Sequence, residues 1–207
     1  SGLVEKFSAR GHALYLVGGS VRDALLGRLG NDLDFTTPAR PEVVKEILDE
    51  WAETVWDTGI AYGTVSAVYK GQQIEITTFR SDSYDGQSRN PEVIYGDSLE
   101  GDLVRRDFKV NAMAIELLAD ATFEFHDPLG GLHDVANKVL DTPDKPEISF
   151  HDDPLRMLRA ARFASQLEFH VADRVVAAMR DMAAEIQRIT VERVQVELDK
   201  LMCGKAP

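Results

Sequence analysis

The sequence predicts an α+β fold of about 140 residues followed by an all-helical segment. Over residues 12–115, apolar patterns with strand spacing alternate with patterns of helical spacing. From residue 152 onward the apolar spacing is helical almost to the last residue. Residues 141–149 carry two prolines and are typical of a linker. We therefore expect one domain over residues 1–140 and a second over residues 141–207.

Short alternating apolar runs predict strands in the first domain, at residues 13–17, 33–36, 64–69 and 73–79. Lys70-Gly71 joins the last two of these strands as a hairpin. Helices are predicted at residues 21–29 and 41–51, the second with proline in its first turn. Two further apolar runs, 110–117 and 122–125, are ambiguous in type. Together these segments predict a mixed sheet of about five strands.

Residues 81–97 are polar and contain glycine and proline, which predicts a long mobile loop of the kind that is often functional. The helices of the second domain are expected at residues 153–168, 172–188 and 190–202. The last helix runs nearly to Pro207, so we expect the natural protein to continue beyond it.

Charge is unevenly distributed along the chain. The net charge is −12, and residues 1–153 carry 14 Lys and Arg against 28 Asp and Glu, whereas the remainder carries 9 against 7. An acidic first part argues against broad electrostatic binding of a polyanion there. No run of about 18 apolar residues exists, so no membrane span is predicted. The single cysteine, Cys203, excludes a disulfide framework and favours a reducing cytoplasm.

The strongest local signal is a Gly-Gly turn that leads into a helix, Gly18-Gly19-Ser20-Val21-Arg22. Glycines let the backbone approach a phosphate closely, and a helix start presents free N–H groups to it. Asp32 and Asp34 follow at a spacing of two on a short strand, which places both carboxylates on one face. A solvated strand edge is the plainer interpretation of this pair. Beside a phosphate cradle, however, the pair predicts a magnesium site suited to phosphoryl or nucleotidyl transfer.

Three further groups are candidates for the same chemistry. Glu75, flanked by apolar residues on a strand, is either a third metal-binding carboxylate or a solvent-facing residue. Arg106 follows another arginine and precedes Asp107, so the pair is either solvated or offers a phosphate-binding fork and an acceptor for a ribose hydroxyl.

A third set lies at the start of the second domain: Asp153, Arg156, Arg159 and Arg162. The arginines recur every three residues along one side of a helix, and Asp153 lies within pairing reach of Arg156. These residues either form an internal salt bridge or read the hydrogen-bonding edge of a nucleobase. The histidines show no ligand spacing, so no zinc site is predicted; they are His12, His126, His133, His151 and His170.

These motifs, in this order, resemble the class II tRNA nucleotidyltransferase and bacterial poly(A) polymerase family over nearly the whole chain. The resemblance rests on Gly18-Gly19-Ser20-Val21-Arg22-Asp23 with Asp32-Leu33-Asp34, on Arg105-Arg106-Asp107, on Asp127-Pro128-Leu129-Gly130-Gly131, on Asp153-Pro154-Leu155-Arg156, and on Glu192-Arg193 through Leu198-Asp199-Lys200-Leu201. It implies a polymerase-beta-like nucleotidyltransferase head with a mixed sheet, followed by a helical neck.

The resemblance also implies roles for the motif residues. Asp32 and Asp34 would bind two Mg²⁺, with Glu75 as the third catalytic carboxylate. The remaining residues would bind CTP or ATP: Gly18, Gly19, Ser20 and Arg22 at the triphosphate, Arg106 and Asp107 at the ribose, and Asp153, Arg156, Arg159 and Arg162 at the base. The helix from Glu192 to Leu201 would steady this base template. The second substrate would be the 3′ end of tRNA or another RNA, and no oligomeric state is predicted.

Within the family, the sequence favours CCA addition. Many bacterial poly(A) polymerases carry a basic stretch where this chain has Lys70-Gly71-Gln72-Gln73. Poly(A) polymerase activity is the first alternative. Asp152 is a small departure from the family's motif, which commonly has Glu at this position. An inactive nucleotide-binding module is the alternative from another class, although such a module need not keep both Asp32 and Asp34.

Overall fold

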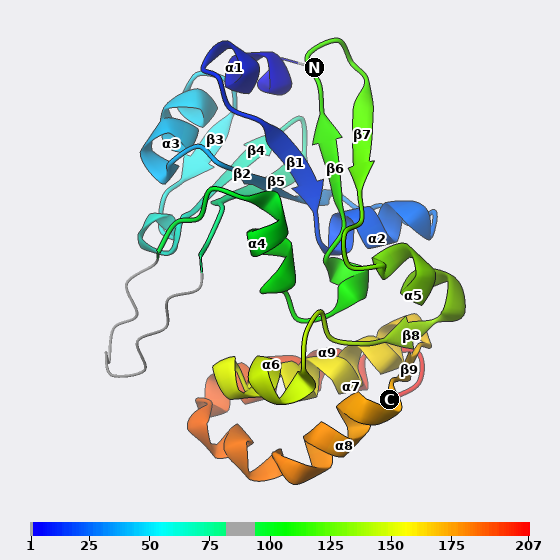
Figure 1. Cartoon of the computed structure of the whole chain (residues 1–207). Coiled ribbons are helices and arrows are strands. Elements are labelled where there is room, and N and C mark those ends of the chain that lie inside the picture. The colour runs from blue at the N-terminus through cyan, green and yellow to red at the C-terminus, as the bar shows by residue number, and fades with distance from the viewer. Residues whose placement is uncertain (1, 82–93) are drawn as a thin grey trace. The chain divides into compact units, whose positions relative to one another are not determined.

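The computed structural model describes residues 2–81 and 94–207 and divides into two compact units (Figure 1). Unit 1 comprises Ser1–Val104 and Met113–Pro128, and unit 2 comprises Arg105–Ala112 and Leu129–Pro207. The Arg-Arg-Asp segment therefore belongs to the same unit as the C-terminal helices. Residues 82–93 of the predicted loop lie outside the described residues. The domain boundary expected at residue 140 stays a prediction.

Unit 1 is built on a mixed sheet, for which the described residues supply seven strands in the order β3-β4-β5-β2-β1-β6-β7. The strands are β1 (Leu14–Val17), β2 (Asp32–Thr37), β3 (Thr54–Trp56), β4 (Thr64–Tyr69), β5 (Gln72–Thr78), β6 (Ala114–Leu117) and β7 (Phe123–His126). The β2–β5 pair is parallel, and the other neighbouring pairs are antiparallel.

Four helices accompany this sheet in the described part of unit 1: α1 (Leu3–Ala9), α2 (Gly19–Leu25), α3 (Pro41–Asp49) and α4 (Leu99–Val104). Helices α1 and α3 pack on one face, where Phe7, Val44 and Ile47 are fully buried against Phe35 and Ile76 of the sheet. Alternation along each strand sends the intervening residues to the opposite face. That face carries Asp32 and Asp34 of β2.

Unit 2 contains five helices in its described residues: α5 (Gly131–Asn137), α6 (Pro146–Asp152), α7 (Leu155–Leu167), α8 (Asp173–Asp181) and α9 (Val191–Met202). Its core includes Phe150, Met157, Val175 and Ala178. A short parallel pair, β8 (Val139–Leu140) with β9 (His170–Val171), accompanies the helices. Three 3₁₀ turns complete the secondary structure of the described chain: Ile60–Tyr62 in unit 1, and Lys109–Asn111 and Ala183–Arg188 in unit 2.

The structure confirms the hairpin at Lys70-Gly71, because both residues have positive φ, 50° and 76°, as a two-residue type I′ turn requires. The helix predicted over 21–29 ends at Leu25, since Gly27 adopts a φ of +70° and stops it. The ambiguous run at 110–117 divides into a 3₁₀ turn and strand β6.

Two expectations about elements were wrong. The linker predicted over 141–149 contains the start of α6, because Pro146 occupies the first turn of that helix instead of breaking it. The sheet has more strands than the five expected, partly because β3 is a three-residue strand with two exposed positions and little apolar signal. Among the described residues, no helix is long and apolar enough to cross a membrane.

Candidate active site

The Gly-Gly turn connects β1 to α2, and its backbone conformation requires glycine at position 18. Gly18 has φ +67° and ψ −138°, a conformation that side chains disfavour strongly. A Cβ on Gly19 would lie 3.2 Å from Nη2 of Arg22, so the missing side chain lets this guanidinium approach the backbone. Arg22 is only 7% exposed, and its Nε donates to Oδ1 of Asp23 at 2.9 Å. The turn therefore fixes a buried cation at the start of α2.

Ser20 connects this turn to the carboxylate strand. The Asp34 N–H donates to Ser20 Oγ at 3.0 Å, and the same hydroxyl donates to the Asp32 carbonyl at 3.4 Å. Ser20 is 5% exposed. Because its hydroxyl is held between two backbone groups of β2, it locks the Gly-Gly turn to the Asp-x-Asp segment. A contact between Ser20 and nucleotide stays a prediction.

Three carboxylates lie on the face of the sheet opposite to the one that α1 and α3 cover. Asp34 lies in parallel register with Glu75 of β5, and Glu75 lies opposite Ser66 of β4. Residues in register on neighbouring strands share a face, so Asp32, Asp34 and Glu75 project from the same side. All three are exposed. A set of carboxylate oxygens fits the ligand preference of Mg²⁺. The catalytic roles of the three residues stay a prediction, as does the metal itself.

Asp107 is a buried acceptor inside unit 2. Its Oδ2 accepts from Nε and Nη2 of Arg159, at 2.9 and 2.6 Å. Its Oδ1 accepts from the Asn111 amide at 3.0 Å and from the Phe108 N–H at 2.8 Å. Both oxygens thus bind protein donors. In this structure the Asp107 carboxylate positions Arg159, and the predicted contact with ribose would have to share those oxygens.

Arg159 and Arg162 are held together on α7 by an acid from α9. Arg162 Nε donates to Oε2 of Glu197 at 2.6 Å, and Arg159 Nη1 lies 3.6 Å from its Oε1. Arg162 also donates to Gln166 at 3.1 Å, and its guanidinium lies 4.1 Å from the ring centre of Phe163. Glu197 is 5% exposed, so this pairing is shielded from water. The predicted nucleotide-binding arginines are therefore rigidly supported.

Asp153 and Arg156 do not form the internal salt bridge that was one of the two expectations for this pair. Asp153 Oδ2 pairs with Nη2 of Arg193 at 3.1 Å, so the internal salt bridge to Arg156 does not form in the described structure. Arg156 instead donates to Oγ of Ser149 at 2.9 Å and to the Arg105 carbonyl at 2.6 Å. Each member of the predicted base template is thus held by a separate partner, and base recognition by the pair stays a prediction.

The pKa of the Asp107 carboxyl reflects these contacts. Burial alone would raise the pKa, but the Arg159 charge and the hydrogen bonds from Asn111 and Arg159 outweigh burial and hold it below its ordinary value. A carboxyl whose pKa is lower in the folded chain than in the unfolded chain stabilises the fold. This stabilisation is complete above the pKa of the unfolded chain, about 3.9, and is lost as the pH falls through the pKa of the folded chain.

We therefore expect Asp107→Asn to lower the free energy of unfolding at neutral pH by roughly 1–3 kcal/mol, because a charged, buried hydrogen-bond partner is removed. The loss of stability below about pH 4 should become shallower than in the unchanged chain. Urea unfolding from pH 6 to pH 2.5 measures both effects. Asp181→Asn, an exposed acid on α8, is the matched control and should leave the curve unchanged. If the free energy of unfolding fell equally steeply with pH in Asp107→Asn and in the unchanged chain, the proposed contribution of the Asp107 carboxylate would be contradicted.

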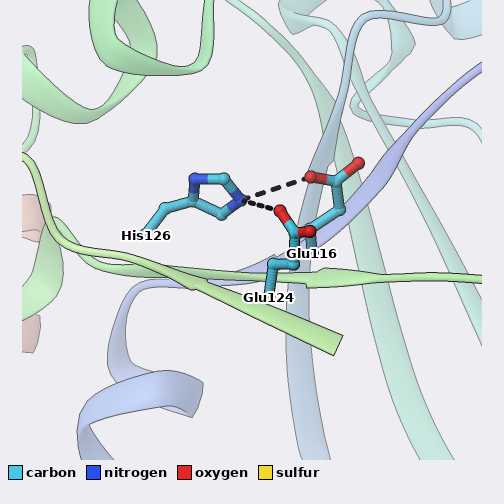
Figure 2. A group of neighbouring side chains, drawn as sticks. All are labelled: Glu116, Glu124 and His126. Carbon is cyan, nitrogen blue, oxygen red and sulfur yellow. Dashed lines mark hydrogen bonds and ion pairs between the residues drawn. The ribbon is translucent and has the colours of Figure 1, made fainter. Parts of the chain in front are cut away.

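Several functional candidates were missed in the sequence. Glu197 gave no individual signal, because its partner Arg162 lies 35 residues away. Ser149 lies only seven residues before Arg156, but it is on α6 and not on the same helix as Arg156, so helical spacing did not reveal the contact. Among the described residues, Glu116, Glu124 and His126 also form a group that could hold a metal ion, shown in Figure 2. The Glu-x-His alternation on one strand was the available signal, but histidine spacing alone did not reveal it.

Comparison with known proteins assigns the class of this chain. Residues 14–141 match the family model described as the Poly A polymerase head domain, and residues 168–207 match one described as the probable RNA and SrmB- binding site of polymerase A. The chain belongs to the poly(A) polymerase head-domain family.

Similar proteins in this family include CCA-adding enzymes. The enzyme of Enterococcus faecalis is 41% identical over 203 residues, which cover 98% of this chain and 48% of that protein. The structure of the Bacillus stearothermophilus CCA-adding enzyme in complex with CTP matches with a TM-score of 0.84 and 38% identity, over 98% of this chain and 47% of that one. The Thermotoga maritima CCA-adding enzyme complexed with tRNA matches with a TM-score of 0.80 and 29% identity, over 99% and 46%. This chain spans about half the length of these relatives.

Proposed function

We propose that this chain is part of an enzyme that adds CMP and AMP, from CTP and ATP, to the 3′ end of tRNA. The observation that carries the proposal is the register of Asp32, Asp34 and Glu75 on one sheet face, locked by Ser20 to the Gly-Gly turn and Arg22. Relatives that are named CCA-adding enzymes support the choice of reaction.

In the proposed reaction, the 3′-hydroxyl oxygen of the RNA forms a bond to the α-phosphorus of the nucleotide. The bond between the α-phosphorus and its bridging oxygen breaks, pyrophosphate leaves, and the hydroxyl proton is released. Asp32 and Asp34, with Glu75 as the third carboxylate, would hold two Mg²⁺. Bound Mg²⁺ lowers the pKa of an attacking hydroxyl and neutralises charge on the leaving group.

The protein's own residues would orient the nucleotide. Arg22 supplies a buried positive charge, and Gly19, which has no side chain, lets the Arg22 guanidinium lie close to the backbone of the turn, where the triphosphate would bind. Arg106 and Asp107 would act at the sugar, and Asp153 and Arg156 at the base. Because Asp153 and Arg156 are already held by protein partners, their orientation is set before the nucleotide binds, and positioning would supply much of the rate. We place the reaction in the cytoplasm.

Sequencing of RNA product ends tests this proposal. The full-length protein is incubated with Mg²⁺ and a tRNA that lacks its terminal CCA, with CTP alone, ATP alone, or both. Ends that read CCA only when both nucleotides are present support CCA addition. Long runs of A with ATP alone would identify a poly(A) polymerase instead, and no incorporation with any nucleotide would overturn the assignment.

The charge distribution predicts weak RNA binding by the present chain. Its first 153 residues carry 14 basic against 28 acidic side chains, and tight RNA binding draws on several Lys and Arg contacts to phosphate. We expect the 207-residue chain to bind CTP or ATP with Mg²⁺ but to bind tRNA with a Kd above about 1 μM at near-physiological salt. Calorimetry with nucleotide and filter binding with tRNA measure the two affinities. Submicromolar tRNA binding would show that the RNA-binding surface lies within these residues.

A further inference from the structure

A second group of metal-ligand side chains lies on the hairpin of β6 and β7, away from Asp32 and Asp34. Glu116 is directly opposite Glu124 in the antiparallel register, and His126 follows two residues after Glu124 on the same face. Figure 2 shows the three side chains pointing toward one another from the two strands. His126 Nε2 lies 3.2 Å from Oε2 of Glu116 and 4.0 Å from Oε2 of Glu124.

This arrangement concentrates negative charge in one place. Like charges directly opposite each other on neighbouring strands destabilise the pairing. Here the two carboxylates face each other and share a single imidazole. Their side chains are accessible, with Glu116 20%, His126 34% and Glu124 65% exposed. A cation bound between them would relieve the repulsion and could enter directly from solvent.

Neighbouring residues restrict how the side chains of Glu116, Glu124 and His126 can be oriented. The Tyr15 ring meets the His126 ring edge-on, with centroids 5.9 Å apart, and so limits its orientation. Ala114 lies opposite His126 in the register, and its small side chain leaves the imidazole free to turn toward the carboxylates. Ligands from two strands joined by a tight turn are also held at nearly constant separation.

We propose that Glu116, Glu124 and His126 bind a divalent first-row transition metal, with Zn²⁺ as the representative ion. The three ligand atoms lie within 4.8 Å of one another, so small side-chain rotations bring them to the roughly 2.0–2.2 Å of zinc–nitrogen and zinc–oxygen bonds. One imidazole with two carboxylates suits Zn²⁺ better than Mg²⁺, which favours oxygen ligands alone. A water molecule would complete a four-coordinate site. The bound ion would tie β6 to β7 at the edge of the sheet.

The test begins by removing the other carboxylate set. In the Asp32→Asn/Asp34→Asn background, calorimetric titration with Zn²⁺ should show a single site per chain, and Co²⁺ should give the visible absorption of a bound, low-coordinate ion. Mg²⁺ at the same concentration should not compete. No Zn²⁺ binding in this background would overturn the proposal.

Single substitutions then locate the site. His126→Gln and Glu116→Gln should each weaken Zn²⁺ binding at least ten-fold, since even loss of a residue that only supports a ligand costs about 10–100-fold. The matched control is His170→Gln, an exposed histidine of β9 outside the group, which should bind Zn²⁺ as before. Should a variant fail to fold, Glu124→Gln changes the most exposed ligand and gives the same readout. Zn²⁺ binding that survives His126→Gln in a folded chain would show that the three residues form only an ion pair.

Discussion

Replacing Asp32 or Asp34 with alanine should abolish nucleotide addition while leaving the fold intact. Both side chains are exposed, so their removal creates no cavity. The Asp34 backbone N–H remains bonded to Ser20 Oγ, which preserves the local geometry. Loss of a group that binds the metal and stabilises charge in the transition state should reduce kcat by about 10³-fold or more.

Single-turnover incorporation from radiolabelled CTP, in the full-length protein, measures this effect. Asp57→Ala is the matched control, because Asp57 is an exposed acid of the same unit with no proposed part in the site, and it should leave the rate unchanged. Circular dichroism verifies that each variant folds. Near-normal incorporation by a folded Asp32→Ala protein would contradict the assignment of the carboxylates.

Arg156→Ala should erode base discrimination more than it weakens triphosphate binding. The Arg156 guanidinium is held by Ser149 Oγ and the Arg105 carbonyl, so it presents its remaining donors in a fixed direction. A nucleotide whose base loses one hydrogen-bond partner loses about 1–3 kcal/mol of transition-state stabilisation, or roughly 5–150-fold in kcat/KM. The preference for CTP and ATP over GTP and UTP should fall by that factor.

Competition between the four nucleotides in one incorporation reaction gives the measurement. Ser149→Ala removes one support of Arg156 and should produce a smaller loss of discrimination in the same direction. Arg180→Ala, an exposed arginine of α8, serves as the control and should retain full discrimination. Uniformly slower incorporation with unchanged base preference would show that Arg156 has only a structural role.

Local features of the site were predictable because they depend on neighbouring residues. The alternation of Asp32 and Asp34 fixes their common face, and the Gly18-Gly19 pair fixes the turn, whatever the rest of the chain does. Glu75 could be named as a candidate from its apolar neighbours. That it lies beside Asp34, however, depends on the parallel pairing of β2 with β5, which the sequence does not specify.

Contacts between distant segments account for what was missed. Asp153 lies three residues before Arg156, yet its partner is Arg193, 40 residues away. Asp153 has an extended backbone between α6 and α7, so the spacing rule for two residues of one helix does not hold for this pair, and tertiary packing brings Arg193 nearer. The contact between Glu197 and Arg162 was missed because the two residues are 35 positions apart in the sequence. His126 was dismissed on sequence spacing, because its carboxylate neighbours include one from the opposite strand.

The most direct test of the central claim is a balance between nucleotide added and pyrophosphate released. The full-length protein is given CTP, ATP, Mg²⁺ and a tRNA without its terminal CCA, and both products are measured over time. We expect one pyrophosphate for each nucleotide joined to the RNA, dependence on Mg²⁺, and loss of both products in Asp34→Ala. Nucleotide hydrolysis without RNA extension, or extension that persists in Asp34→Ala, would contradict it.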